Sequence, residues 1–247
     1  MSALYFYAKN GYNIKYDCGS AKRGTIRYQK KIKVRGETMY TCAKCNVLAC
    51  GSQDPAVREK MPKNCPMREK EKMEGAYEKY ALEENHEFYV SCSEIEGEGY
   101  CQWPRLKETV EFCKKMGYKK IGLAFCRGLR KEARVVADLF TAQGFDVVSV
   151  ICKTGGFPKE TAGIPKEGKI HADAFEPMCN PIAQAEFLNS QETEFNIALG
   201  LCVGHDSMFY KYSKQMVTTL VAKDRVLAHN PCGAIYCAEG YFKKRLQ

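Results

Sequence analysis

The sequence has no long hydrophobic run: none approaches the roughly 20 apolar residues that a transmembrane helix needs. Its first residues, MSALYFYAKNGYNIKYD, also lack the continuous apolar stretch of a secretory signal. Cysteine accounts for 14 of the 247 residues, a lower share than the roughly 8–10% of small disulfide scaffolds. We therefore expect a cytoplasmic protein with no membrane partner, in which clustered cysteines bind metal or carry out redox chemistry.

Several common catalytic motifs are missing. There is no G-x-S-x-G nucleophile elbow and no H-E-x-x-H helix, which argues against the hydrolases that depend on them. The run Thr154-Gly155-Gly156 matches neither a Walker motif nor a dinucleotide fingerprint. His205 and His229 lie close to cysteines in the sequence, and each is interpreted as a metal ligand, a proton donor or a hydrogen-bonded loop residue.

Acidic residues are scarce at the N-terminus. Nine Lys and Arg residues fall within residues 1–40 against two carboxylates, so this stretch carries +7 of the net charge of +9. We interpret residues 1–38 as a basic extension, in which scattered tyrosines allow a short β-hairpin. A solvated extension is the simpler interpretation, and we expect no nucleic-acid partner, although a basic arm leaves that possibility open.

Residues 39–103 are interpreted as a cysteine-rich metal-binding segment with a helix. The spacing Cys42-x2-Cys45-x4-Cys50, followed by Cys65-Pro66, supplies four thiols in a stretch with few apolar residues, which favours metal ligands over core residues. Pro66 predicts a helix that runs to about residue 85. Residues 86–103 are expected to be irregular, with Cys92 and Cys101 available to complete either metal site.

Residues 104–247 are predicted to form an α/β domain. A helix is expected from Trp103-Pro104 to about residue 116, with Cys113 as a small core residue on its apolar stripe. Apolar segments at 119–126, 145–152, 195–202 and 216–222, with a short fifth at 226–229, are predicted strands, and helices are expected at 127–144, 181–188 and 204–214. This alternation predicts a small parallel sheet with flanking helices.

The cysteines of this domain follow strands or precede helices. They are Cys126, Cys152, Cys179, Cys202 and Cys232, with Cys237 in reserve. Ligands of open parallel sheets bind beyond the carboxyl ends of the strands, so the first five are expected at one edge. Helix N-termini there lower thiol pKa values through unpaired N–H groups and a partial positive charge.

Four basic residues are expected near the same strand ends. They are Arg127, Arg130, Lys131 and Lys153. These side chains either offset the charge of a metal cluster, hold an acidic substrate or remain solvated.

Thiolates are soft ligands that suit zinc and iron–sulfur clusters. The N-terminal spacing matches neither the bacterial nor the plant-type ferredoxin pattern. Zinc sites commonly contain two C-x-x-C knuckles, and this segment has one, so the sequence favours iron–sulfur clusters, of the 4Fe–4S type. The predicted metal ligands are Cys42, Cys45, Cys50, Cys65, Cys92, Cys101, Cys126, Cys152, Cys179, Cys202, Cys232 and Cys237.

The function favoured by the sequence is iron–sulfur redox or electron-transfer chemistry with an unidentified redox partner. An iron without a fourth thiolate would bind substrate as a Lewis acid, which would make the protein a reductase or lyase. One alternative is a zinc-binding structural or interaction module without redox activity. Another is thiol–disulfide chemistry at Cys42 and Cys45, which requires a preceding strand where the sequence predicts none.

Six motifs in combination carry a family resemblance: CAKCNVLAC, the Cys65-Pro66 step, AFCRGLRKEA, EPMCNP, GLCVGHDSMF and NPCGAIYC. Over roughly residues 40–240, the chain resembles an uncharacterised prokaryotic family of cysteine-rich proteins with about a dozen shared cysteines. Setting aside Cys18 and Cys113 leaves twelve cysteines here. The resemblance implies metal binding and no particular reaction, substrate or partner.

Overall fold

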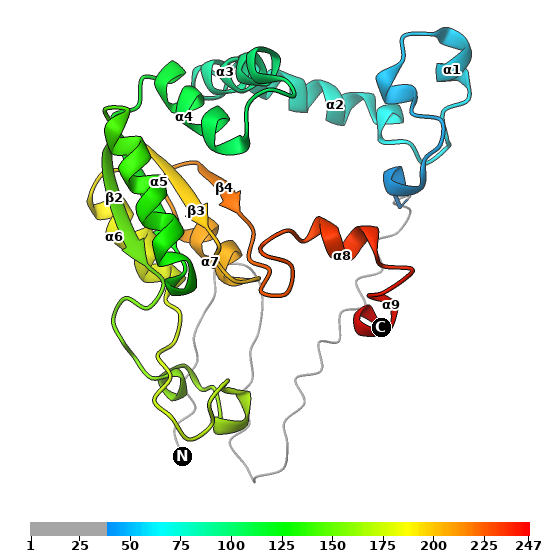
Figure 1. Cartoon of the computed structure of the whole chain (residues 1–247). Helices are drawn as coiled ribbons and strands as arrows, with labels where there is room; N and C mark the ends of the chain where they lie inside the picture. Colours follow the sequence, from blue (N-terminus) through cyan, green and yellow to red (C-terminus); the bar gives the residue numbers. More distant parts are fainter. Residues whose placement is uncertain (1–38) are drawn as a thin grey trace, which may run out of the picture. The chain divides into compact units, whose positions relative to one another are not determined.

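The computed structural model describes residues 39–247. The basic extension, its hairpin and Cys18 lie outside the described residues. The chain divides between Lys70 and Glu71 into two compact units (Figure 1), so the division falls inside the segment 39–103 that the sequence analysis treated as one region. No helix of the described chain combines the length and the apolar character needed to cross a membrane.

A sheet of four parallel strands forms the centre of the second unit. The strands are β1 (Lys120–Phe125), β2 (Asp146–Ile151), β3 (Phe195–Leu199) and β4 (Val217–Val221), arranged in the order β2-β1-β3-β4. Phe125 pairs with both Ile151 and Leu199, so the three strands β2, β1 and β3 end at the same level. The predicted α/β fold with a small parallel sheet is therefore confirmed.

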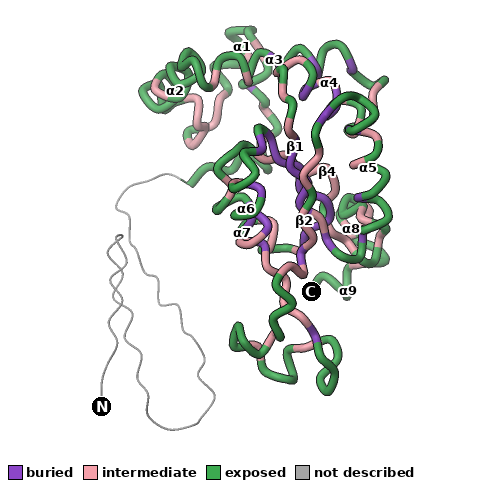
Figure 2. The backbone as a smooth tube through the Cα atoms, turned by 90° about the vertical axis from the view of Figure 1, so that its left-hand side faces the viewer, coloured by how far each residue is buried: buried purple, intermediate pink, exposed green. Residues whose placement is uncertain are grey.

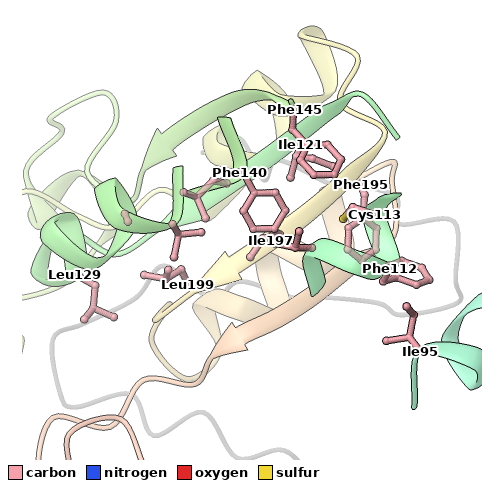
Figure 3. Close-up of a cluster of buried hydrophobic side chains, with 14 residues drawn as sticks. Ile95, Phe112, Cys113, Ile121, Leu129, Phe140, Phe145, Phe195, Ile197 and Leu199 are labelled. Atoms are coloured by element: carbon pink, nitrogen blue, oxygen red, sulfur yellow. The ribbon is translucent and has the colours of Figure 1, made fainter. Parts of the chain in front are cut away.

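Apolar side chains cover both faces of this sheet. On one face, α5 (Arg130–Ala142) and α4 (Arg105–Lys115) contribute Phe140 and Phe112 to a cluster that contains Ile121 and Ile197 of the central strands (Figure 3). On the other face, α6 (Pro181–Ser190) and α7 (His205–Tyr212) contribute Leu188 and Phe209. The central strands β1 and β3 are almost wholly buried, and the buried residues gather around the sheet (Figure 2), so these two strands provide a rigid base for the loops that follow them.

Two predictions about residues 65–103 are wrong. The stretch expected to be irregular forms the long helix α3 (Glu83–Gly99), whose buried residues Ser91, Ile95 and Gly99 recur every four positions. A Cβ atom at Gly99 would lie 2.6 Å from the Trp103 ring, so glycine permits a close approach here. Packing therefore overrides the weak helix propensity of glycine.

The single helix predicted from Cys65 to about residue 85 is instead divided into short pieces. They are the 3-10 turns η3 (Pro66–Arg68) and η4 (Glu78–Ala81), with α2 (Lys70–Tyr77) between them. None of these pieces contains a buried residue. Without a packed face, the pattern that suggested one helix has nothing to hold it straight.

The expected fifth strand at 226–229 is a turn. Asp224 Oδ1 accepts the backbone N–H groups of Val226 and Leu227, both at 2.8 Å. Ala228 and His229 have positive φ angles of 49° and 64°, which extended strands do not adopt. The chain then forms two short helices, α8 (Cys232–Tyr236) and α9 (Lys243–Leu246).

The first unit is built of short turns. It contains η1 (Cys42–Lys44), η2 (Ala49–Gly51) and α1 (Pro55–Glu59), and Ala49 is its one buried residue among positions 39–70. Asp54 Oδ1 caps α1 by accepting the Ala56 N–H at 2.9 Å. Local hydrogen bonds therefore define this unit, since its hydrophobic core amounts to one small side chain. The remaining 3-10 turns, in the second unit, are η5 (Arg127–Leu129), η6 (Lys159–Ala162) and η7 (Lys166–Gly168).

Candidate metal centre at the sheet edge

Strand ends and helix starts hold four cysteines at the carboxyl edge of the sheet. Cys126 follows β1 and donates its backbone N–H to Leu199 O at 3.1 Å, and Cys152 follows β2 and donates to Phe125 O at 2.9 Å. Both residues thus continue the strand ladders by one step. Their side chains start from backbone that the sheet fixes.

The other two cysteines precede helices. The carbonyl of Cys202 accepts the N–H groups of His205 and Asp206, the first residues of α7. Cys179 precedes Asn180, whose N–H donates to Cys152 O at 2.7 Å and whose side chain caps α6 by accepting the Ala183 N–H at 3.1 Å. Cys179 is therefore held beside the residue that follows β2 through its neighbour Asn180.

The four thiols form a closed ring of neighbours. All four line one small cavity, and the side chains of Cys126 and of Cys179 each interact with those of Cys152 and Cys202. Cys126 and Cys152 are 8% and 3% exposed, and Cys179 and Cys202 are partly buried. Four thiols from four separate segments thus meet at one point, and none of them forms a disulfide.

The ring lies where ligands of open α/β sheets usually bind. The chain moves from β1 outward to β2 and then returns to place β3 on the other side of β1. The crevice beyond β1 and β3 is therefore the topological switch point of this sheet, where two successive connections leave in opposite directions. Cys126 and Cys202 follow these two strands.

The thiols influence one another's protonation. Hydrogen bonds from Cys152 and Cys202 lower the pKa of Cys126 and of Cys179. Correspondingly, hydrogen bonds to Cys126 and Cys179 raise the pKa of Cys152 and of Cys202. The four groups therefore titrate as a unit. A cation is what would allow all four to ionise.

Donors and cations surround the sulfurs. The backbone N–H of Arg127 donates to Cys152 Sγ at 3.3 Å, and the Arg225 guanidinium donates to Cys202 Sγ at 2.9 Å. Gly128 lowers the pKa of Cys126, and the Lys153 ammonium, whose Nζ donates to Pro177 O, lowers the pKa of Cys179. This environment stabilises negative charge on sulfur. The sequence analysis named Arg127 and Lys153 but missed Arg225, because only the turn at Asp224 brings it back to the edge.

A narrow cavity adjoins the ring, and two polar atoms face it without a partner. The cavity is lined by Gln184, Leu201 and His205 together with the four cysteines. Gln184 is fully buried, and its Nε2 donates to Val150 O at 2.7 Å and Phe125 O at 3.3 Å. Gln184 Oε1 and His205 Nδ1 have no hydrogen-bond partner. Sequence reasoning named His205 but missed Gln184, which looks like an ordinary helix residue.

The remaining cysteines predicted for this edge or as additional ligands do not join the ring. Cys232 and Cys237 are exposed, because the strand expected before Cys232 is a turn and Cys232 instead begins α8. Cys92 lies on α3, and Cys101 lies beyond its end; both are exposed. Cys113 is fully buried in the core, as expected, and burial raises its pKa to about 12.

In the first unit, the predicted N-terminal ligands lie on neighbouring turns. The Cys45 N–H donates to Cys42 O at 3.0 Å, which closes the C-x-x-C knuckle. Asn64 Nδ2 donates to Met39 O and to Thr41 Oγ1, both at 2.8 Å. Through these bonds, the residue before Cys65 contacts the residue before Cys42. Cys50 lies on η2 and is exposed.

Neither group of thiols is a finished coordination shell. Among residues 39–247, no three or more His, Cys, Asp and Glu side chains are already placed to hold a metal ion. Binding an ion at the sheet edge therefore requires cysteine side chains to rearrange, on a backbone that the strand ends and helix starts already hold in position.

Comparison with known proteins gives the family of the chain. A family model described as "Protein of unknown function (DUF1847)" matches residues 65–220. The chain belongs to this family. The uncharacterized protein MJ0455 of Methanocaldococcus jannaschii is 43% identical over 206 residues, which cover 83% of this chain and 98% of that relative. The predicted membership of an uncharacterised prokaryotic family is confirmed, and the matched region contains all four cysteines of the ring.

Proposed function

We propose that the protein binds a metal centre through the thiolates of Cys126, Cys152, Cys179 and Cys202. One observation carries the proposal: four cysteines from four separate segments form a closed ring at the ligand-binding edge of the sheet. A single buried cysteine is usually a small core residue, but core packing does not explain why four cysteines from separate segments lie together. The surrounding N–H donors and cations support the charge that four thiolates would carry.

The dimensions of the ring favour a single ion over a large cluster. Four thiolates at about 2.3 Å from a tetrahedral zinc ion stand about 3.8 Å from one another, which is close to direct sulfur–sulfur contact. The space beside the ring is too narrow to hold a water molecule. A 4Fe–4S cluster contains an inorganic core of its own, so the four segments would have to move apart to hold it.

An iron centre remains the second candidate, because the ring has the donors that tune iron redox sites. The N–H group of Arg127 and the Arg225 guanidinium donate to its sulfurs. Such hydrogen bonds raise the reduction potential of an iron–thiolate centre. They equally stabilise zinc thiolates, so this observation permits a redox function without selecting it.

Four available thiols make this a closed site. Structural zinc sites are filled by four protein ligands, whereas catalytic sites keep one position for water or substrate. The ring therefore supports a structural role or electron transfer better than Lewis-acid catalysis. A reductase or lyase that binds substrate on the metal would need one of the four cysteines to leave.

We also propose a second metal site at Cys42, Cys45, Cys50 and Cys65. The bonds from Asn64 support it, since they bring together the turns that carry Cys42 and Cys65. The near absence of a core supports it further, because so small a unit usually needs a metal or disulfides to fold. Free thiols in both units fit a cytoplasmic, reducing location.

Metal and sulfide analysis after anaerobic purification tests the proposal. Zinc without acid-labile sulfide, in a colourless protein, is the expected result for single-ion sites. Iron without sulfide indicates a mononuclear iron centre, whereas iron with stoichiometric sulfide and broad absorbance near ~400 nm indicates a cluster. Protein that contains neither metal after anaerobic purification, and that takes up neither on addition, would overturn the proposal.

A further inference from the structure

A groove beside the outer strand β2 carries three basic side chains. The groove has a volume of about 660 Å³, and α5, which forms one wall, lies over β1 and β2 (Figure 1). Arg130, Lys131 and Arg134 of α5 line it. Within the described residues, no ion pair or hydrogen bond joins any of the three to a carboxylate.

The placement of these cations works against the stability of the helix. Arg130 and Arg134 stand four residues apart, on the same side of α5, where like charges repel one another. Asp138 stands four residues after Arg134, but among residues 39–247 no ion pair joins them, whereas Lys107 and Lys114 pair with Glu111, and Lys115 pairs with Glu94. An anionic ligand between the two arginines would relieve their repulsion. Guanidinium groups also bind carboxylates and phosphates through two parallel hydrogen bonds.

The floor of the groove is largely apolar. It is formed by Phe125 of β1, Ile151 of β2 and the small residues Ala133 and Ala137, with the Ser149 side chain at the exposed edge. Pockets for small molecules typically enclose about 300–1,000 Å³ and combine apolar walls with a few polar groups. A concave site with cations on one wall and a carbon-rich floor suits a ligand with an anionic head and an apolar body.

The groove and the candidate metal centre lie on opposite faces of the sheet. Phe125 and Ile151 end β1 and β2, and each is followed directly by a cysteine of the ring. Because side chains alternate between the two faces of a strand, Cys126 and Cys152 pack on the side of α6 and α7, and a ligand on this floor would not contact their thiols. Because β2 is an edge strand, the opposite side of the groove is not closed by a further strand.

We propose that this groove binds a small organic anion, a phosphate ester or a carboxylate, through Arg130 and Arg134. The proposal goes beyond the metal site and does not depend on which metal is bound there. The apolar floor favours a ligand that carries an apolar group beside its anionic group, and inorganic phosphate has no apolar group. The concave shape distinguishes the groove from a flat basic surface for nucleic acid.

Binding of two fluorescent anions by the full-length, metal-containing protein tests this. The probes are 1-naphthyl phosphate and 1-naphthylacetate, with inorganic phosphate as a competitor that has no apolar body. Saturable binding of at least one probe with a Kd below about 1 mM is expected, and the tighter of the two identifies the head group. If neither probe binds at that affinity, or if inorganic phosphate competes as well as a probe, the proposal is wrong.

Two variants and one control connect binding to the groove. The double variant Arg130→Gln/Arg134→Gln removes the cations and should weaken probe binding at least tenfold. Ser149→Phe fills the groove at an exposed position and keeps every charge, and it should weaken binding by a similar factor. The control Lys214→Gln/Lys244→Gln removes two exposed cations outside the groove and should change binding less than twofold.

Other outcomes would contradict the inference. Equal weakening in the control would mean that net charge alone attracts the probes. Unchanged binding in Ser149→Phe, with its fold confirmed by circular dichroism, would place the probes elsewhere. Tighter binding of a single-stranded oligonucleotide that Ser149→Phe leaves unchanged would make the basic wall a nucleic-acid surface. Metal content is measured in each sample, so a failure of the metal proposal remains separate.

Discussion

Two groups of four cysteines occupy very different surroundings in this protein. The sheet-edge ring stands on the ends of β1 and β2 and on the starts of α6 and α7, above a core that includes Ala124, Leu188 and Phe209. The N-terminal group stands on 3-10 turns of a unit with one buried side chain. At the sheet edge the packed fold positions the thiols. In the N-terminal group, metal binding by the thiols is expected to order the chain.

This difference shows what a metal would contribute in each place. In a packed scaffold, folding has already ordered the backbone that carries the ligands, so metal binding adds little further order to the chain. Ligands on loosely supported turns would gain their order from the ion, and binding energy there becomes folding energy. Metal removal should therefore leave the chain around the sheet-edge ring ordered, whereas the chain around the N-terminal cysteines should lose its order.

Metal removal should have the largest effect, and the two units should respond to it differently. After treatment with a strong chelator, residues 39–70 are expected to lose most of their amide protection, because Ala49 alone cannot hold the turns together. The strands of the sheet should keep theirs. Hydrogen exchange measured by mass spectrometry checks this, and equal protection of both units after complete metal loss would contradict the comparison.

Single serine substitutions should separate the two sites next. Cys202→Ser removes one thiol of the ring and should lower bound metal by about one equivalent, since a tetrahedral site needs all four ligands. Cys45→Ser should lower the metal at the other site by a similar amount. Elemental analysis gives both results.

The matched control for these substitutions is Cys232→Ser, at an exposed position outside the ring. It should leave metal content unchanged. Loss of metal in this control would show that the ring is incomplete as described. If only one of the two site substitutions lowers metal content, the two-site comparison fails.

Gln184→Leu tests how far the sheet supports the ring. The substitution removes the two hydrogen bonds that Gln184 Nε2 donates to Val150 O and Phe125 O, while Phe125 O keeps the Cys152 N–H as a donor. With about 0.5–1.5 kcal/mol for each lost hydrogen bond, we expect the free energy of unfolding to fall by about 1–3 kcal/mol in urea titrations. Gln191→Leu, exposed just after the same helix, is the control and should change it by less than about 0.5 kcal/mol. If Gln184→Leu leaves the free energy of unfolding unchanged, water or atoms of the ring replace the hydrogen bonds of the amide.

Alkaline pH should have the smallest effect and should involve a cysteine that belongs to neither group. Burial raises the pKa of Cys113 to about 12, from its usual value of 9.0. The neutral thiol therefore contributes stability that is complete below pH 9 and declines as the pH rises toward 12. Cys113→Ala should make the loss of stability across this range less steep. An unchanged slope in denaturant titrations at pH 8 and pH 10.5 would show that Cys113 ionises without cost.

The parallel sheet could be predicted because its signals are local. Apolar runs end at Cys126 and Cys152, and a proline-led helix follows Cys179, so position in the chain translates directly into position at the sheet edge. The placement of Cys232 could not be predicted in the same way. A four-residue apolar stretch suggested a strand, and the Asp224 side chain, which determines the turn, lies outside that stretch.

Long-range packing explains the other differences. Glycines and a run of polar residues hid α3, whose helical form depends on Trp103 packing against Gly99. Gln184 and Arg225 reach the ring from segments far along the chain, and neither stands in a motif. Their side chains find buried carbonyls or a sulfur only once the strands are in place. Such partners are properties of the assembled fold and leave no local pattern.

The distribution of the ring along the sequence has a consequence for biosynthesis. Cys126 and Cys202 belong to strands that must pair across a crossover before their sulfurs meet, and such non-local contacts form late. Cys42 and Cys45 share one turn, so a nascent chain could capture an ion there while the rest is still on the ribosome. Metallation of the two units is thus expected to be sequential, with the second ion entering only a finished sheet.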